Sequence, residues 1–275
     1  MLQKFLINLF SSNKLNNYIF NYEFMSINIP PKKFRHIVIF TGGTFPLPKF
    51  CKYFFKNHVN PDFIIAADSG LEVLDLFNDY YKKNIFLPDV ILGDMDSLKN
   101  KNLLKKYKDF SKCQIEKFNP YKDFSDTELA LILASKLKTD NSIITLIGGS
   151  GGRIDHLMSI YNLFSTSIRP NFWLSSDQLI SLVPKNNTIS ILPSKKSSPI
   201  SILLPFENNR KTLKSKNFIK SFGLEWEYNL FRNTFIPSLS NEISLEHFSK
   251  KIPATIHSKK DILVATEFNS LIKIF

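Results

Sequence analysis

Four short apolar runs in this chain each stop abruptly at a polar or glycine-rich segment. The four stretches, each written with its tip, are Ile37–Gly43, Phe63–Gly70, Asp89–Ser97 and Ile143–His156. An uninterrupted apolar run of this length is typical of a strand buried on both faces of a parallel sheet. Open parallel sheets bind ligands at the carboxyl ends of their strands, so we expect the four tips to gather around one crevice.

Segments with a helical pattern separate these runs. The expected helices are Lys49–Asn57, Leu71–Tyr81, Lys101–Phe110, Thr127–Lys138 and His156–Ser167, and two more strands, Phe172–Leu174 and Leu179–Val183, close the region. Strands that alternate with helices form βαβ units. We therefore predict an α/β N-terminal domain with a mostly parallel sheet over residues 36–185.

The pattern changes after Lys185. Short β-type runs follow one another at 188–193, 201–206, 212–218, 234–236, 254–257 and 261–268, broken by Pro, Asn, Ser and paired lysines. Helical periodicity is confined to a possible turn at 245–249. Several short strands with turn residues between them favour a β-sandwich or a small barrel. We predict an all-β, sandwich-like C-terminal domain over residues 186–275.

Residues 1–35 differ from both regions, and we interpret them as an N-terminal extension. The segment MLQKFLINLF is interrupted by Lys4 and Asn8 and is shorter than the ~20 apolar residues of a membrane span. It is either a targeting or amphipathic extension, or translation begins at Met25. Both alternatives make the extension dispensable for the fold, and neither predicts a membrane protein.

The formal net charge is +12, which raises the question of an anionic partner. The lysines are scattered in short pairs such as Lys32-Lys33 and Lys259-Lys260. This distribution favours a solvated basic surface over a nucleic-acid-binding stripe, so we expect no nucleic acid partner. The two cysteines, Cys51 and Cys113, form no CxxC pair, which fits a reducing compartment and predicts a cytoplasmic protein.

Carboxylates occupy two of the strand tips. Asp68 follows one apolar run directly, and Asp94 and Asp96 follow the next, two residues apart. In an extended chain the side chains of Asp94 and Asp96 share one face, where they can hold a hard cation such as Mg²⁺ with substrate phosphates. The structural alternatives are a turn at Asp94–Ser97 and a helix N-cap at Asp68.

The segment Ser125–Glu128 has the sequence of a capping box. Ser125 is the expected N-cap residue and Glu128 its partner three positions later, ahead of an apolar helix. Asp126 then lies in the first turn, where the helix dipole favours a negative charge. The functional alternative is that Asp126 faces the same crevice and binds metal or substrate.

The most informative segment is GGSGGRIDH, residues 148–156. Its glycines follow a strand and precede a helix, where backbone N–H groups can hold phosphates. Arg153 adds donors suited to phosphate oxygens. The segment lacks the GK[ST] of a Walker loop. Asp155 and His156 have an alternative interpretation as helix caps, and His156 has no partner at metal-ligand spacing.

The order of these motifs is more specific than any one of them. ADSG, then FLPDVILGDMDS, then KDFSDTELAL, then IGGSGGRIDH resembles the thiamine pyrophosphokinase family between about Gly42 and Phe164. The resemblance resumes at GLEWEY (Gly223–Tyr228) and SNE (Ser240–Glu242). It implies transfer of pyrophosphate from ATP to the hydroxyethyl oxygen of thiamine, with release of AMP. It also implies Mg²⁺, an α/β domain followed by a β-sandwich, and a homodimer with a shared active site.

The resemblance further implies roles for individual residues. The expected metal ligands are Asp68, Asp94 and Asp96, and Asp126 completes the catalytic set around the magnesium triphosphate. The expected nucleotide-binding residues are Gly148, Gly149, Ser150, Gly151, Gly152, Arg153, Asp155 and His156. Thiamine is expected to contact Asp126, Ser240 and Asn241. Its pyrimidine ring is expected to stack on Trp226, which comes from the partner subunit. Two positions depart from the family pattern: Ser69 replaces a glycine and Ser125 a threonine.

Other classes of function stay open at this point. One is another Mg²⁺-dependent DxD-type transferase that uses nucleotides. A second is a nucleotide- or thiamine-binding protein without turnover, although the complete set of Asp residues argues against it. A third, nucleic-acid binding through the +12 charge, predicts a strong dependence on salt.

Overall fold

The computed structural model describes residues 27–28, 32–83, 85–111, 113–120, 123–205, 218–228 and 238–275. Contacts divide the chain into two compact units, residues 1–42, 61–144 and 166–169 in the first and residues 43–60, 145–165 and 170–275 in the second. Most of the predicted extension, and the predicted strands at 212–217 and 234–236, lie outside the described residues. The domain limits predicted at residues 35 and 185 stay predictions.

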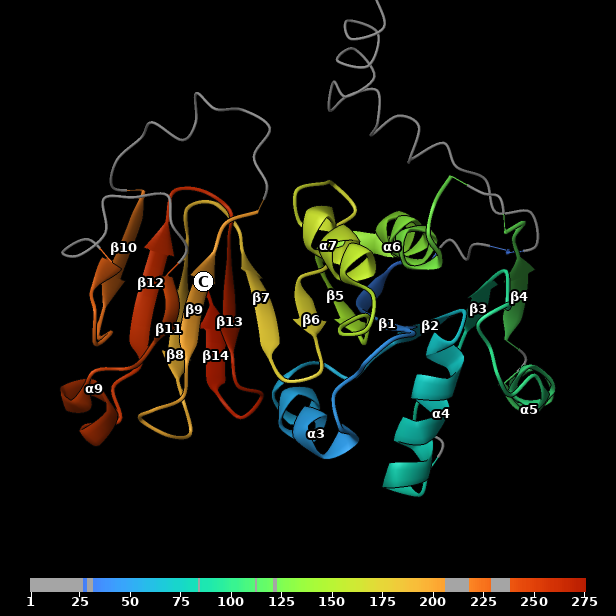
Figure 1. The fold of residues 1–275 in the computed structure, drawn as a ribbon, viewed down its shortest axis with the longest axis horizontal. Coiled ribbons are helices and arrows are strands. Elements are labelled where there is room, and N and C mark those ends of the chain that lie inside the picture. The colour runs from blue at the N-terminus through green and yellow to red at the C-terminus, as the bar shows by residue number, and fades with distance from the viewer. Residues whose placement is uncertain are drawn as a thin grey trace, which may run out of the picture. The chain divides into compact units, whose positions relative to one another are not determined.

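The first unit contains a parallel sheet. Its strands are β1 (Phe34–Thr41), β2 (Phe63–Ala67), β3 (Val90–Gly93) and β4 (Gln114–Lys117), hydrogen-bonded in the order β1-β2-β3-β4. Its helices are α4 (Gly70–Tyr81), α5 (Asn102–Ser111) and α6 (Asp126–Leu137). Helices α4 and α6 pack on opposite faces of the sheet (Figure 1). The sequence predicted all of these elements except β4.

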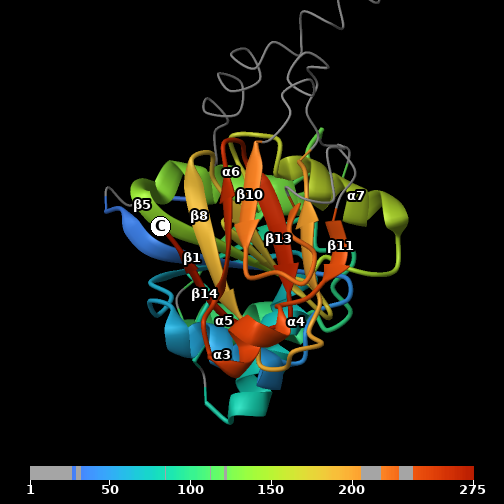
Figure 2. The same cartoon turned by 90° about the vertical axis from the view of Figure 1, so that its left-hand side faces the viewer.

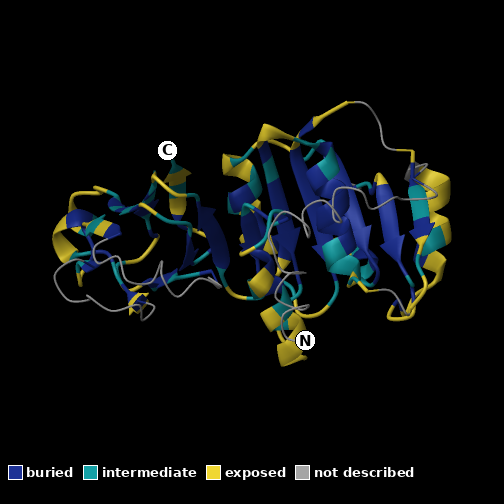
Figure 3. Cartoon of the chain, turned by 90° about the horizontal axis from the view of Figure 1, so that it is seen from above, coloured by how far each residue is buried: buried dark blue, intermediate teal, exposed yellow. Residues whose placement is uncertain are grey.

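Burial on both faces explains why β2 is apolar throughout. Every residue of β2 is buried, and so are the central residues of α6, Leu129–Ala134. Figure 3 shows the strands buried and the outer faces of the helices exposed. Gly70 permits close packing of α4 on β1, because a Cβ at this position would lie 2.1 Å from the carbonyl oxygen of Phe40.

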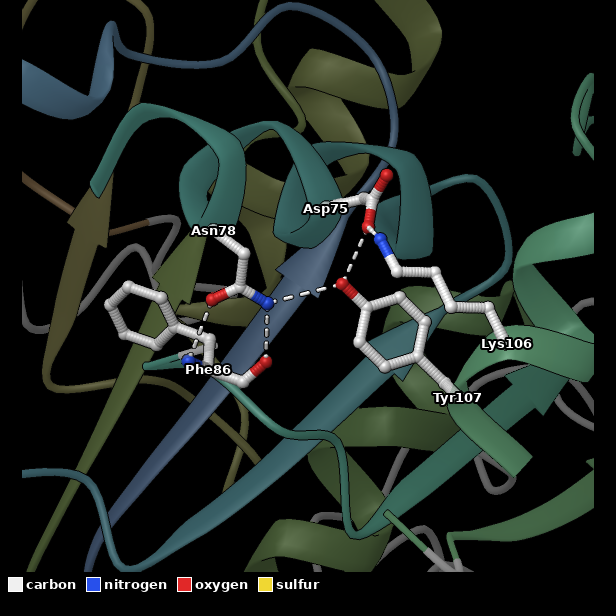
Figure 4. A network of polar contacts seen from close by, with 5 residues as sticks. All are labelled: Asp75, Asn78, Phe86, Lys106 and Tyr107. Atoms are coloured by element: carbon white, nitrogen blue, oxygen red, sulfur yellow. Dashed lines mark hydrogen bonds and ion pairs between the residues drawn. The ribbon is translucent and has the colours of Figure 1, made fainter. Parts of the chain in front are cut away.

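A polar network joins α4, α5 and the segment before β3 (Figure 4). The Asn78 side chain accepts a hydrogen bond from the Phe86 backbone N–H at 2.9 Å and donates to its carbonyl at 2.8 Å. Asn78 also donates to the Tyr107 hydroxyl at 3.1 Å, and that hydroxyl donates to Asp75 at 2.6 Å. Lys106 forms an ion pair with Asp75 at 2.5 Å. Burial raises the pKa of the Tyr107 phenol, and its hydrogen bond to Asp75 raises it further.

The second unit is rich in antiparallel strands. Its strands are the end of β5 (Lys138–Ile147), β6 (Phe172–Leu174), β7 (Leu179–Val183), β8 (Asn187–Leu192), β9 (Ile200–Leu203), β10 (Ile219–Phe222), β11 (Ser238–Asn241), β12 (Ala254–Ser258), β13 (Ile262–Thr266) and β14 (Leu271–Ile274). Its helices are α3 (Pro48–Asn57), α7 (Ile154–Leu163) and α9 (Leu245–Ser249). The sequence did not predict β10, β11 and β14, and its predicted run at 212–218 ends just before β10.

These strands form two sheets. One has the order β11-β9-β13-β7-β6-β5 within this unit, and the other has the order β10-β12-β8-β14. Figure 2 shows this unit toward the viewer, with β8, β10, β13 and β14 labelled. Strand β5 pairs in parallel with β6, and the later pairs are antiparallel. Ile189 and Ile191 of β8 share one buried cluster with Ile200 and Ile202 of β9, so the sheets pack face to face. The prediction of an α/β region followed by a β-sandwich is therefore confirmed.

Candidate functional site

Three carboxylates meet at the ends of the strands of the first unit. Asp68 follows β2, Asp94 follows β3 and Asp126 is the first residue of α6. One oxygen of each lies within 4.8 Å of the others. Asp68 is buried, and Asp94 and Asp126 are partly exposed. We call these three residues the acidic cluster.

The parallel pairing of β2 with β3 brings the first two carboxylates together. Ala67 lies opposite Leu92, and the Asp68 backbone N–H donates to the Leu92 carbonyl at 2.8 Å. Gly93 separates Leu92 from Asp94, and a Cβ at this glycine would lie 3.2 Å from the carboxyl carbon of Asp126. A glycine at the end of β3 therefore makes room for the cluster.

The start of α6 fixes the third carboxylate. The Ser125 hydroxyl accepts from the Glu128 backbone N–H at 3.3 Å, and the Glu128 carboxylate accepts from the Ser125 N–H at 2.7 Å. The predicted capping box is thus confirmed. The hydroxyls of Thr127 and Thr41 lie 2.7 Å apart and join α6 to β1. Asp126 is both a first-turn residue and a member of the acidic cluster, so its two interpretations are compatible.

The environment of Asp68 favours a bound cation. Burial raises the pKa of its carboxyl, opposed by hydrogen bonds from Ser69 and Ser97 and reinforced by the charges of Asp94 and Asp96. Its Oδ1 atom is buried without a hydrogen-bond partner among the described residues. A buried carboxylate next to other negative charges is stabilised by a cation, and oxygen donors suit a hard divalent ion. The donor set therefore fits Mg²⁺.

The backbone around Asp96, the remaining predicted metal ligand, is not extended. Met95, between Asp94 and Asp96, has φ of 63°, so the expectation that the two carboxylates share one face of an extended chain is wrong. Asp96 is exposed, its N–H donates to Asp94 Oδ1 at 3.2 Å, and its own carboxylate accepts from Ser97. Asp96 lies outside the acidic cluster, and its role as a metal ligand stays a prediction.

Asp68 is not the cap of the helix that follows it. The N-cap residue of α4 is Ser69, and its side chain makes no capping hydrogen bond. Asp68 itself has φ of 48°, a left-handed conformation that residues other than glycine rarely adopt. A non-glycine residue held in this conformation at a ligand-binding edge is typical of a functional position.

The glycine-rich segment lies in the second unit. Gly148, Gly149, Gly151 and Gly152 all have positive φ, between 73° and 99°. Ser150 pairs with Thr44 through two backbone hydrogen bonds of 2.6 and 3.0 Å. A Cβ on Gly151 would lie 2.3 Å from the Thr44 hydroxyl, so this loop requires glycine for close packing as well as for its backbone conformation.

The Ser150 side chain belongs to the framework of this loop. Its hydroxyl donates to the Thr44 carbonyl at 3.0 Å and accepts from the Ser176 N–H at 2.6 Å. The Trp173 indole N–H donates to the Gly148 carbonyl at 2.7 Å. Thr44 and Trp173 were not among the predicted site residues, because nothing in their local sequence marks them as partners of a loop so distant in the chain.

Arg153, Asp155 and His156 are exposed at the start of α7. Arg153 is the N-cap residue and makes no side-chain capping bond, so the interpretation of Asp155 and His156 as caps is wrong. Arg153 forms an ion pair with Asp155 at 2.5 Å, and its hydrogen bond lowers the pKa of that carboxyl. The ion pair thus holds the guanidinium beside Asp155 at the start of α7.

Of the residues predicted to contact thiamine, Asp126 lies in the first unit, whereas Trp226, Ser240 and Asn241 lie in the second. Trp226 is 52% exposed, whereas Asn241 is only 1% exposed. The Asn241 side chain hydrogen-bonds the Trp226 backbone. Ser240 is exposed, has φ of 53°, and donates from its backbone N–H to the Ser201 hydroxyl at 3.0 Å. The two short motifs that resumed the family resemblance are therefore neighbours in space.

The fold and the acidic cluster define a class of protein in which a parallel α/β unit presents carboxylates at its strand ends and a β-sandwich follows. Residues 55–172 match the family model described as "Thiamin pyrophosphokinase, catalytic domain". Over these residues the match confirms the resemblance found in the motifs. A comparison of the sequence with curated proteins gave no match.

Several solved structures share the fold. A thiamin pyrophosphokinase family protein from Enterococcus faecalis is 18% identical, with a TM-score of 0.57 over 85% of this chain and 98% of that chain. Thiamin pyrophosphokinase from Candida albicans is 17% identical, with a TM-score of 0.56 over 88% and 96%. The Bacillus subtilis enzyme is 19% identical, with a TM-score of 0.56 over 85% and 98%. At these identities the likeness shows the fold alone.

No helix in the part of the chain that the structure describes has the length and apolar character required to cross a membrane.

Proposed function

We propose that this protein is a thiamine pyrophosphokinase, which transfers the pyrophosphoryl group of ATP to thiamine and forms thiamine diphosphate and AMP. The family match over residues 55–172 supports this reaction. The observation that carries the proposal is the acidic cluster of Asp68, Asp94 and Asp126, since nucleoside triphosphates react as Mg²⁺ complexes and these carboxylates fit that ion.

The reaction exchanges one phosphorus–oxygen bond for another. The hydroxyethyl oxygen of thiamine bonds to the β-phosphorus of ATP, and the bond from that phosphorus to the α–β bridging oxygen breaks. AMP leaves with the bridging oxygen, and the hydroxyl proton passes to solvent. Such transfers depend mainly on alignment and on neutralisation of charge.

The acidic cluster holds the cation for this reaction, with Asp96 as a proposed further ligand. Bound Mg²⁺ supplies positive charge to the phosphate oxygens. The carboxylates of Asp94 and Asp126 would each offer an oxygen to the ion, and the buried Oδ1 of Asp68 would offer a third.

The glycine-rich segment and Arg153 provide the contacts to phosphate. Backbone N–H groups of Gly151 and Gly152 and the start of α7 suit phosphate oxygens. Arg153 and Asp155 are both exposed, so the guanidinium can exchange its carboxylate partner for a phosphate with little cost in desolvation. Asp155 then keeps Arg153 near the loop when no nucleotide is bound.

The half-exposed ring of Trp226 provides a surface for the aromatic pyrimidine of thiamine. Ser240 precedes the buried Asn241 in the sequence and is itself exposed, so its hydroxyl is available to the same ligand. The family resemblance adds that the protein is a homodimer and that Trp226 serves the active site of the partner subunit.

Mass-resolved analysis of the products formed from ATP, Mg²⁺ and thiamine tests the proposal. We expect AMP and thiamine diphosphate in equal amounts. Asp94→Asn is expected to lower the rate roughly 100-fold or more, because the loss of metal binding removes several kcal/mol of stabilisation. Asp109→Asn, which changes an exposed carboxylate of α5, is the matched control and should leave the rate unchanged.

The same experiment separates the alternative functions. ADP, or a nucleotidylated product without AMP and thiamine diphosphate, would indicate a different transferase. Binding of ATP and thiamine without any product in a single turnover would indicate a protein that binds these ligands without catalysis. Either result would overturn the proposed reaction.

A further inference from the structure

The side chain of Asn241 is hydrogen-bonded to the backbone of the segment that contains Trp226. Its Oδ1 accepts from the Trp226 N–H at 3.2 Å and from the Glu242 N–H at 2.9 Å. Its Nδ2 donates to the Trp226 carbonyl at 2.8 Å. The Asn241 amide therefore hydrogen-bonds both the N–H and the carbonyl of Trp226, as a neighbouring β-strand would. At 1% exposure, Asn241 presents almost no surface to a ligand.

The two segments are joined on either side of this contact. The Glu225 N–H donates to the Glu242 carbonyl at 2.8 Å, and the Ser244 N–H donates to the Gly223 carbonyl at 2.8 Å. Leu224 and Ile243 form an antiparallel bridge between them. These bonds align residues 223–226 with residues 241–244, and Asn241 extends the alignment by one residue to Trp226.

The side chain of Lys196 also links the two aligned segments. Its ammonium lies 2.7 Å from the Glu242 carboxylate and 3.3 Å from that of Glu225. The two glutamates belong to the two aligned segments, so one cation bridges both. The pKa of Lys196 is raised, first by its hydrogen bond to Glu242. Without this cation the two carboxylates would repel each other next to Trp226.

An aromatic residue fixed by its backbone but exposed through its ring is well suited to stacking on a ligand. A ring already held in place loses little conformational freedom when a ligand binds, which improves affinity without any new contact. The buried Asn241 provides the fixation, and the half-exposed Trp226 provides the surface.

We propose that Asn241 is a positioning residue for Trp226, assisted by Lys196, and that it sets the affinity for the aromatic acceptor without contacting it. The inference rests on the proposed function for the identity of that acceptor, thiamine. It replaces the direct contact between Asn241 and thiamine that the family resemblance implied.

The test uses ¹⁹F NMR of the full-length protein labelled with 5-fluorotryptophan. The chain has two tryptophans, so Trp226→Phe assigns the two signals, and the buried Trp173 serves as an internal control. In Asn241→Ala we expect the Trp226 signal to narrow and to move toward the shift of free fluorotryptophan, while the Trp173 signal stays unchanged. An unchanged Trp173 signal also shows that the second unit is still folded.

Thiamine and nucleotide binding are measured on the same variants. Asn241→Ala is expected to raise the Kd and KM for thiamine roughly tenfold, the factor that about 1.4 kcal/mol represents, with little change for ATP. Lys196→Met should change thiamine affinity in the same direction by a smaller factor. Lys250→Met removes an exposed ion pair with Glu246 on α9 and is the matched control, for which we expect no change.

Two results would overturn the positioning role. One is a loss of thiamine affinity in Asn241→Ala with an unaltered Trp226 signal, which would show that Asn241 contacts thiamine directly. The other is an altered Trp226 signal with unaltered thiamine affinity. If the wild-type protein binds no thiamine, the proposed function fails, while the Trp226 signal of Asn241→Ala still decides whether Asn241 fixes the ring.

Discussion

Gly93 packs closely against Asp68 at the end of β3, in a backbone conformation that favours glycine. A Cβ on Gly93 would lie 3.0 Å from the Cβ of Asp68, and φ of Gly93 is 142°. This distance is tighter than most real Cβ contacts, so Asp68 would have to shift slightly, and this φ is rare for residues with side chains. The acidic cluster therefore depends on a residue that carries no functional group.

Gly93→Ala is expected to destabilise the fold and to weaken cation binding together. We expect the free energy of unfolding to fall by about 1–3 kcal/mol from backbone strain, with further loss from crowding against Asp68 and Asp126. Chemical denaturation measures the first effect, and titration with Mn²⁺ followed by EPR measures the second. Gly152→Ala is the control for strain alone, since a Cβ there meets nothing within 4 Å. Equal stability of the two variants, with normal Mn²⁺ binding in both, would refute this role of Gly93.

Asp68 is expected to oppose folding at neutral pH when no cation is bound. Burial raises its pKa above the usual 3.8, so the folded state favours the protonated carboxyl. Its contribution to stability is present at low pH and is lost as the pH rises through the raised pKa. In EDTA at pH 7, Asp68→Asn should therefore be more stable than the wild type, and the difference should shrink toward pH 4.

Saturating Mg²⁺ should reverse this order, because the cation stabilises the wild type by mass action and the variant has lost one of its ligands. Thermal unfolding at pH 4, 5, 6 and 7, with EDTA and then with Mg²⁺, provides the measurement. A variant that is less stable than the wild type in EDTA at every pH would show that Asp68 serves the fold itself.

The network around Tyr107 is expected to act on stability alone. Tyr107→Phe removes the hydroxyl that links Asp75 to Asn78, and the buried donor left on Asn78 should cost about 1–3 kcal/mol of unfolding free energy. Lys106→Met breaks the more exposed ion pair with Asp75 and should cost less than about 1 kcal/mol. Urea unfolding compares the two, and unchanged Mn²⁺ affinity in both is the accompanying expectation. A larger loss from Lys106→Met would contradict this ranking.

The elements with strong patterns were predictable from the sequence. Buried parallel strands such as β2 are apolar throughout, and the capping box at Ser125 marks the start of α6. Strand β4 was missed because Gln114–Lys117 is only four residues long and has a single apolar residue, Ile115. Strand β11 was missed because Ser238–Asn241 has a single apolar residue, and its pairing with β9 comes from the tertiary fold.

The candidate site was predictable in its residue types but less so in its geometry. The sequence placed Asp68 and Asp94 at strand tips and Asp126 in the first turn of a helix, and the structure brings the three together. It did not reveal the left-handed Met95 that separates Asp96 from the cluster, since that conformation depends on the turn after β3. The hydrogen bonds between Asn241 and the Trp226 backbone could not be predicted either, because the two residues are 15 positions apart in the sequence.

The transfer of pyrophosphate to the thiamine hydroxyl is tested most directly with thiamine carrying ¹⁸O in its hydroxyethyl group. The protein is incubated with this substrate, ATP and Mg²⁺, and the products are resolved by mass. The account predicts one AMP for each thiamine diphosphate and retention of the ¹⁸O in the thiamine diphosphate, at the bond to phosphorus. Release of ADP in place of AMP, or thiamine diphosphate that has lost the ¹⁸O, would contradict it.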